Sequence, residues 1–153
     1  MRRTTNQALT IRVEEFLPYP VARVWRALTD AELLARWLMP NDFELELGHR
    51  FMFRTAPMPA VGFDGVIHCE VLAIEPRHLL ELSWRGGHGL DSIVTWRLEP
   101  EGDGTRLLIE HTGFDPEDPA QRLAHDVMGK GWRSHILVRL RDCLAEPIPS
   151  YGS

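Results

Sequence analysis

A chain of 153 residues has the length of one domain rather than two, and a domain of that size buries roughly 70% of the surface that its unfolded chain exposes. Hydrophobic residues make up 44% of the chain and charged residues 25%, which excludes a largely disordered protein. The net charge of −5 comes without a basic cluster, so the sequence disfavours a nucleic-acid-binding protein.

The N-terminal part predicts one strand followed by two short helices. Residues 9–14 alternate apolar and polar side chains, as a half-buried strand does, and no apolar run typical of a signal peptide or a membrane span precedes them. Apolar residues then recur three or four positions apart through residues 21–28, which predicts one face of a helix. Thr29 and Glu32 have the spacing of a capping box, so a second short helix is predicted to follow and to run through Trp37.

The middle of the chain predicts a run of antiparallel strands. Glycine, proline and charged turn residues separate its alternating segments, and connections this short join antiparallel neighbours. Residues 56–60 contain two prolines and are predicted to form a loop. Residues 86–89 are predicted to form either a simple hairpin tip or a lid. The predicted strands cover residues 43–47, 50–55, 65–74, 78–84, 91–99 and 105–112.

A long helix is predicted to end the chain. An Asp-Pro pair at residues 115–116, or another at 118–119, can supply its N-cap and its first-turn proline, and the helix is expected to run to Leu144. Gly129 and Gly131 each cost about 1 kcal/mol relative to alanine, which indicates a bend or room for a close neighbour. The predicted apolar face consists of Met128, Trp132, Ile136, Leu140, Cys143 and Leu144, with Leu137 on its flank.

This order of elements predicts a single α+β domain over residues 1–153, with its core at about residues 9–146. A curved antiparallel sheet of about six to seven strands can bury one face only against the terminal helix. The ends of such a wrapped arrangement are hard to fill with side chains, so we expect a cavity between helix and sheet. Strand alternation places aromatic rings and one histidine on the inner face: Phe51, Phe53, Trp84, Trp96 and His111.

Several motifs, in this order, carry a resemblance. They are Pro-Val-Ala-Arg-Val-Trp-Arg-Ala-Leu-Thr-Asp at residues 20–30, Val-Thr-Trp-Arg-Leu at 94–98, His-Thr-Gly-Phe at 111–114, and Gly131-Trp132. Over roughly residues 9–146 the chain resembles the activator of heat-shock-protein ATPase homologue family. That family belongs to the START-like (SRPBCC) superfamily, with the birch pollen allergen and polyketide cyclases. The resemblance implies the helix-grip fold and an internal cavity for lipids, polyketides or similar molecules.

Three functions follow as hypotheses. The favoured one is non-catalytic binding of a small hydrophobic molecule, such as a lipid or an aromatic or polyketide-like compound. The alternative is a cyclase, aromatase or hydrolase that acts on a similar ligand through His111. The third is a stress-response protein that associates with a chaperone. The eukaryotic chaperone activator carries an additional N-terminal domain that this chain lacks, so ATPase activation itself is not expected.

Each candidate residue also has a purely structural interpretation. His111 is first a core histidine satisfied by a hydrogen bond, and acid–base chemistry would require a carboxylate within reach. Any single tryptophan is first a core residue, but several rings that face one space fill or frame it. The predicted ligand-binding residues are Trp37, Phe51, Phe53, Trp84, Trp96, His111, Met128, Trp132 and Ile136, with His111 as the candidate catalytic residue.

No cofactor and no metal site are predicted. Cys69 and Cys143 are interpreted as separate small core residues, and His68 points away from Cys69 because neighbours on a strand face opposite sides. The sequence lacks the spacings typical of metal sites, nucleophile elbows and phosphate-binding loops. We expect a cytoplasmic protein whose partner is a small apolar ligand, without nucleic acid or a membrane span. A homodimer is left open.

Overall fold

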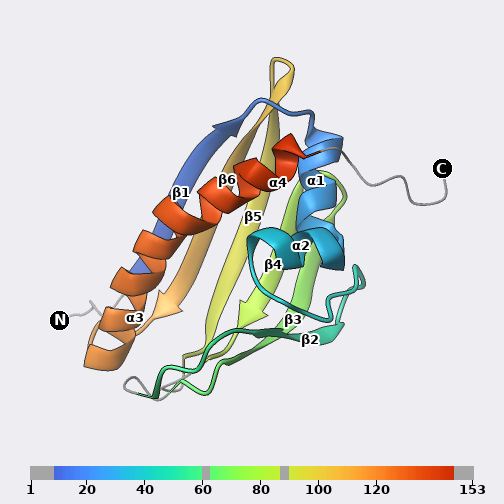
Figure 1. The fold of residues 1–153 in the computed structure, drawn as a ribbon. Coiled ribbons are helices and arrows are strands. Elements are labelled where there is room, and N and C mark those ends of the chain that lie inside the picture. Colours follow the sequence, from blue (N-terminus) through green and yellow to red (C-terminus); the bar gives the residue numbers. More distant parts are fainter. Residues whose placement is uncertain (1–8, 60–62, 87–89, 147–153) are drawn as a thin grey trace.

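The structure is a computed structural model that describes residues 9–59, 63–86 and 90–146, so most of the predicted lid at 86–89 lies outside the described residues. A six-stranded antiparallel sheet curves around a long C-terminal helix, and two short helices lie beside the end of that helix (Figure 1). The prediction of an α+β helix-grip fold is therefore confirmed. None of the described helices combines the length and the apolar character that crossing a membrane would require.

The strands are paired in the order β1-β6-β5-β4-β3-β2, so the N-terminal strand closes one edge of the sheet next to the last strand. All neighbouring strands are antiparallel, as the short turns predicted for the strands that follow one another in the chain. The strands are β1 (Leu9–Leu17), β2 (Arg50–Arg54), β3 (Val66–Glu75), β4 (Leu79–Trp84), β5 (Ser92–Glu101) and β6 (Gly104–Phe114). The helices are α1 (Val21–Thr29), α2 (Ala31–Trp37), α3 (Pro119–Lys130), the π-helical segment η2 (Gly131–Ile136) and α4 (Leu137–Ala145).

The predicted strand at residues 43–47 is wrong, and this segment forms turns that lead into β2. The side chains of Asn41 and Asp42 accept hydrogen bonds from the backbone N–H groups of Phe43 and Met52, at 3.0 and 2.8 Å. These side chains replace the partners that a neighbouring strand would supply. The alternating pattern also misleads because Phe43 is buried whereas Leu45 and Leu47 are exposed.

Aspartates cap two helices. Asp30, not Thr29, caps α2, since its Oδ1 accepts hydrogen bonds from the N–H groups of Glu32 and Leu33. Thr29 instead ends α1 by donating its hydroxyl hydrogen to the Trp25 carbonyl at 2.7 Å. For the terminal helix, the Asp118 alternative is the observed start, because the Asp118 side chain accepts from the N–H of Ala120 and Pro119 is the first helical residue.

The two helical glycines have different surroundings. Gly129 is buried where α3 passes β1, and a Cβ there would lie 3.8 Å from Ile11, at an ordinary van der Waals distance. Gly131 begins the π-helical segment, and a Cβ there would meet nothing within 4 Å. The terminal helix therefore packs beside β1 at Gly129 and faces open space at Gly131.

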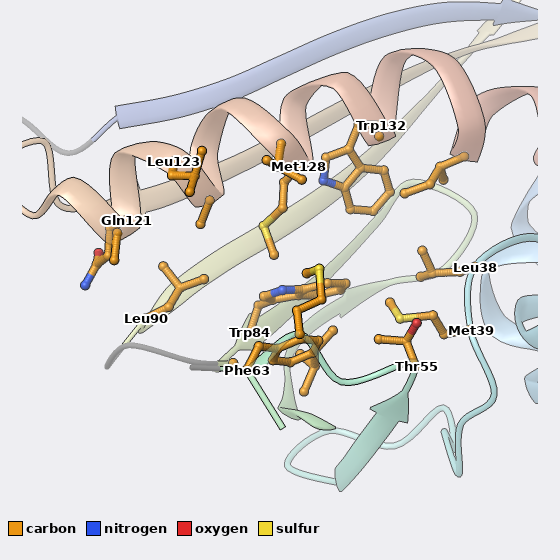
Figure 2. A pocket seen from close by; sticks show the side chains of 18 residues that line it. Leu38, Met39, Thr55, Phe63, Trp84, Leu90, Gln121, Leu123, Met128 and Trp132 are labelled. Carbon is orange, nitrogen blue, oxygen red and sulfur yellow. The ribbon is translucent and has the colours of Figure 1, made fainter. Parts of the chain in front are cut away.

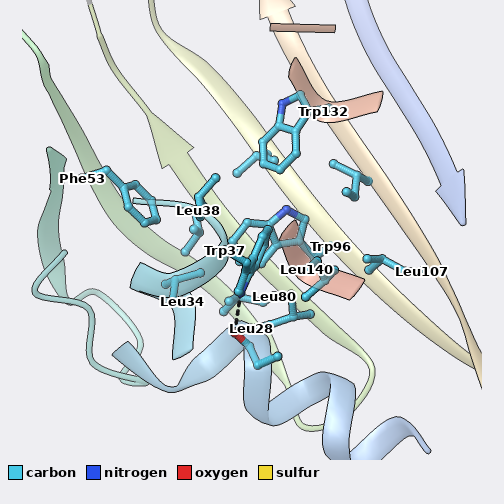
Figure 3. Close-up of a cluster of buried hydrophobic side chains, with 14 of the residues drawn as sticks. Leu28, Leu34, Trp37, Leu38, Phe53, Leu80, Trp96, Leu107, Trp132 and Leu140 are labelled. Atoms are coloured by element: carbon cyan, nitrogen blue, oxygen red, sulfur yellow. Dashed lines mark hydrogen bonds between the residues drawn. The ribbon is translucent and has the colours of Figure 1, made fainter. Parts of the chain in front are cut away.

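A cluster of buried hydrophobic side chains lies where α1, α2 and α4 meet the sheet (Figure 3). The rings of Trp37 and Trp96 lie 5.6 Å apart, and the Trp37 indole donates a hydrogen bond to the Ala27 carbonyl at 2.8 Å. Leu140 of α4 is fully buried in the same cluster. Cys69 and Cys143 are buried free thiols, as predicted, and burial raises the pKa of both.

Candidate functional site

A cavity of about 300 Å³ lies between the first half of the terminal helix and the end of β4 (Figure 2). The helix side is formed by Ala120, Gln121, Leu123, Ala124, Val127, Met128, Gly131, Trp132 and Ile136. The sheet and loop side is formed by Leu38, Met39, Thr55, Met58, Phe63, Ile67, Trp84, Gly86 and Leu90. Leu38 and Trp132 belong both to this lining and to the buried cluster of Figure 3, so the cavity borders that cluster.

The lining is almost wholly apolar. It contains no charged side chain, and its polar side-chain groups are the Thr55 hydroxyl, the Gln121 amide and the indole N–H groups of Trp84 and Trp132. The Gln121 carbonyl oxygen already accepts a hydrogen bond from the backbone N–H of Asp115 at 2.8 Å. Because burial of an unpaired charge is costly, such a space accepts an uncharged apolar molecule more readily than an ion.

The cavity reaches the surface at an apolar rim. Met58, Leu123 and Val127 line it and are 48%, 49% and 51% exposed, respectively. Leu123 and Val127 are four residues apart on α3, so they lie one above the other on the same helix face. An apolar molecule that enters here meets apolar side chains from the start.

A series of buried hydrogen bonds holds Trp132 beside the cavity. The Trp132 indole nitrogen donates to Nδ1 of His111 at 3.4 Å, and Nε2 of His111 lies 2.8 Å from the Ser92 hydroxyl. Ser92 in turn donates to the backbone carbonyl of Trp84 at 2.9 Å. Since Nδ1 accepts, the neutral ring carries its proton on Nε2 and donates it to Ser92. This series of hydrogen bonds thus connects the Trp132 side chain to the backbone of Trp84, and both residues line the cavity.

His111 is a neutral core residue in this arrangement. Burial, with a smaller contribution from His125, lowers the pKa of His111 to about 3. Both ring nitrogens have partners, and the ring is absent from the cavity lining. The arrangement therefore favours the structural interpretation of His111, with Trp132 as the residue that it positions.

Four of the nine predicted ligand-binding residues line the cavity: Trp84, Met128, Trp132 and Ile136. The other five lie outside its lining: Trp37, Phe51, Phe53, Trp96 and His111. These five are fully buried side chains that pack on one another and on Trp84. Strand alternation identifies the inner face, but it does not say where along that face the space stays open. Ligand binding by the four lining residues remains a prediction.

The sequence analysis missed the loop and helix residues that form the mouth of the cavity. Met58 and Phe63 come from the segment around a proline-rich loop, where no periodic pattern exists. Leu123 and Val127 did have a signal, because their spacing continues toward Gly131 along one helix face. Extending the predicted apolar face from Met128 by helical steps leads instead to Ala124 and Gln121, which also line the cavity.

The described residues offer no cluster of three or more His, Cys, Asp or Glu side chains arranged to hold a metal ion. His68 lies on the exposed side of β3, whereas Cys69 is buried. Nothing in the cavity lining supplies charged ligands for a cofactor phosphate or carboxylate. The chemistry that this lining supports is contact with an apolar surface and a few directed hydrogen bonds.

Comparison with solved structures identifies similar proteins. Protein MLL2253 from Mesorhizobium loti is 37% identical, with a TM-score of 0.78, over 89% of this chain and 96% of that one. CalU16 from Micromonospora echinospora is 28% identical, with a TM-score of 0.73, over 90% of this chain and 77% of that one. DynU16, a protein in the dynemicin biosynthetic locus, is 26% identical, with a TM-score of 0.71, over 88% of this chain but 46% of that one.

Sequence comparison with curated proteins gave no significant match. The family model described as "Activator of Hsp90 ATPase homolog 1-like protein" matches residues 18–145, which is most of the chain. Together with the fold and the solved neighbours, this match confirms the resemblance drawn from the sequence motifs. The chain belongs to the Activator of Hsp90 ATPase homolog 1-like family and has its START-like, ligand-binding fold.

Proposed function

We propose that this protein binds a small, uncharged, apolar molecule in the cavity between α3–η2 and β4, without chemical conversion of that molecule. The observation that carries the proposal is the apolar cavity itself, of about 300 Å³, with an exposed apolar rim. Its volume is at the lower end of the range for small-molecule sites. At about 25 cal/mol per Å² of buried apolar surface, a ligand of that size can reach micromolar affinity after ordering costs.

The relatives support a small molecule as the partner. DynU16 is a protein of a biosynthetic locus, which favours a small organic compound over a macromolecule. The two tryptophans of the lining, Trp84 and Trp132, have ring centroids 6.1 Å apart and offer large aromatic surfaces. Such walls favour aromatic or polyketide-like ligands over simple acyl chains.

The other hypotheses have less support. Catalysis through His111 would require the ring to reach the ligand, and His111 is not part of the lining. Association with a chaperone, and with it a role in stress response, rests on the description of the family alone. The cytoplasmic location remains a prediction from the sequence. Retention of a chaperone from cell lysate by the immobilised protein would favour the surface-acting function.

Titration with N-phenyl-1-naphthylamine, an uncharged fluorescent probe, tests the proposal. We expect a saturable rise in probe fluorescence with a dissociation constant of about 1–10 μM, because the ring system leaves water for an apolar wall. Ala124→Phe should weaken binding about tenfold or more, since it adds a ring to a residue of the lining. Ala35→Phe is the matched control, because Ala35 is also a half-buried helical alanine but lies outside the lining. A folded protein without saturable probe binding, or equal effects of the two variants, would contradict the proposal.

A further inference from the structure

Trp84 stands out among the cavity residues because its polar atom lacks a partner. Its side chain is 3% exposed, and its indole nitrogen is buried. The N–H has no hydrogen-bond acceptor among residues 9–59, 63–86 and 90–146. Buried indole N–H groups usually find an acceptor, because burial without one loses the hydrogen bond to water. An unpaired donor on a cavity wall therefore indicates that the acceptor comes from outside the chain.

The other buried tryptophans show what is specific to Trp84. Trp37 donates to the Ala27 carbonyl, and Trp132 donates to His111. The Trp96 nitrogen is also buried without an acceptor in the described part of the chain, but Trp96 is not part of the cavity lining. Of the two unpaired indoles, Trp84 is the one whose side chain lines the cavity.

A flexible side chain lies across the cavity from Trp84. Figure 2 places Trp84 on the sheet side of the cavity and Met128 on the helix side. Met128 is half-buried, and its unbranched thioether side chain can change rotamer at little cost. The Trp84 nitrogen is covered in the structure, so an acceptor atom reaches it through a side-chain movement, such as a change of the Met128 rotamer.

We propose that the ligand is an uncharged aromatic molecule with a carbonyl or ether oxygen that accepts a hydrogen bond from the Trp84 indole N–H. This inference rests on the proposed function and adds the chemical class of the ligand. The acceptor is required because the unpaired group on the wall is a donor. The absence of charge is required because the lining contains no charged side chain to pair with an ionised ligand.

Three naphthalenes of similar shape test this chemistry by isothermal titration calorimetry: 2-acetylnaphthalene, 2-ethylnaphthalene and 2-naphthoate. Trp84→Phe should weaken binding of the ketone about tenfold more than binding of the hydrocarbon, since only the ketone loses a hydrogen bond. Comparison within one variant cancels the different hydration of the two compounds and any change in cavity size. Naphthoate should bind at least tenfold more weakly than the ketone at pH 7, because its carboxylate finds no cation.

Trp96→Phe is the control, because it removes an unpaired indole that lies outside the lining, and it should affect ketone and hydrocarbon equally. If Trp84→Phe does not fold, the wild-type protein still provides a test. The ketone should shift the indole proton resonance of Trp84 downfield in NMR spectra, and the hydrocarbon should not. Equal losses for both ligands, or no specific shift, would overturn the role of Trp84 and leave the cavity as a binding site. If neither ligand nor N-phenyl-1-naphthylamine binds, the proposed function fails and this inference fails with it.

Discussion

The two halves of the terminal helix differ in what lies beneath them. In α4, the residues Leu137, Leu140 and Leu144 are buried against α1, α2 and the sheet. In α3, only Gln121 and Gly129 are buried, and the larger apolar residues are about half exposed. One continuous helix is therefore part of the core at its C-terminal end and a cover over a cavity at its N-terminal end.

Polar contacts reinforce this difference. Arg23 of α1 donates hydrogen bonds to the carbonyl of Leu144 through both Nε and Nη2, and these contacts satisfy an acceptor that the helix end leaves unpaired. Arg36 of α2 reaches the Glu146 carboxylate at 3.4 Å. The α4 end is thus fastened by packing and by hydrogen bonds. Tight packing and open space are therefore divided along one helix, and the cavity lies at the less buried half.

Truncation of one leucine in each half should give the largest contrast. Leu140→Ala should lower the free energy of unfolding by about 3–4 kcal/mol, because it leaves a cavity at a fully buried position. Leu123→Ala should lower it by less than about 1 kcal/mol, since Leu123 is 49% exposed. Urea denaturation followed by circular dichroism measures both values. Similar costs for the two variants would show that α3 is as tightly packed as α4.

The pH dependence of stability tests His111, the β6 residue that contacts Trp132 between the two halves of the terminal helix. The pKa of His111 is lowered from 6.5 to about 3 in the folded state, so between these values the unfolded chain binds a proton that the folded chain excludes. The contribution of His111 is complete above pH 6.5 and decreases as the pH falls, by up to about 1.4 kcal/mol per pH unit. From pH 7.5 to pH 5, the wild type should lose about 2 kcal/mol more than His111→Gln, whose amide does not titrate.

Urea unfolding at the two pH values measures this difference, and the glutamine variant also serves as its control. The glutamine amide can accept a hydrogen bond from Trp132 and donate one to Ser92, so both hydrogen bonds of His111 can still form. If both proteins lose stability equally, His111 titrates normally and is not the buried neutral link to Trp132 described above.

The smallest effect concerns the two helical glycines. Gly131→Ala should raise the free energy of unfolding by up to about 1 kcal/mol, because Gly131 has helical dihedral angles and an added Cβ meets nothing within 4 Å. Gly129→Ala should gain less, since its Cβ would lie 3.1 Å from the Arg133 guanidinium, which has to move. Thermal unfolding of both variants measures the difference. A loss of stability in Gly131→Ala would mean that the helix is not open at this point.

Local sequence patterns predicted the fold well where a period or a cap determines the structure. The alternation of Val94, Trp96 and Leu98 identified the buried face of β5, and the Asp118-Pro119 pair was one of two predicted helix starts. The strand at residues 43–47 failed because the Asn41 and Asp42 side chains take the backbone hydrogen bonds, and no periodic pattern reports such a competition.

The candidate site was predicted only in part. Trp132 and Ile136 were found because they continue the apolar face of the helix, and Trp84 because it faces inward at the end of its strand. Trp96 faces inward for the same reason, yet the space beside it is filled by Trp37 and by α4. The same inward alternation therefore led to one residue of the cavity and one of the core.

Local patterns in the sequence were enough to predict the order of the elements, the inner face of the strands and the apolar face of the last helix, because these features depend on neighbours within a few residues. The position of the open space between helix and sheet became visible only in the folded structure. That space depends on the curvature of the sheet and on side chains from segments far apart in the chain. The partners of His111 were decided in the same way, since Trp132, Ser92 and His111 come from three separate elements.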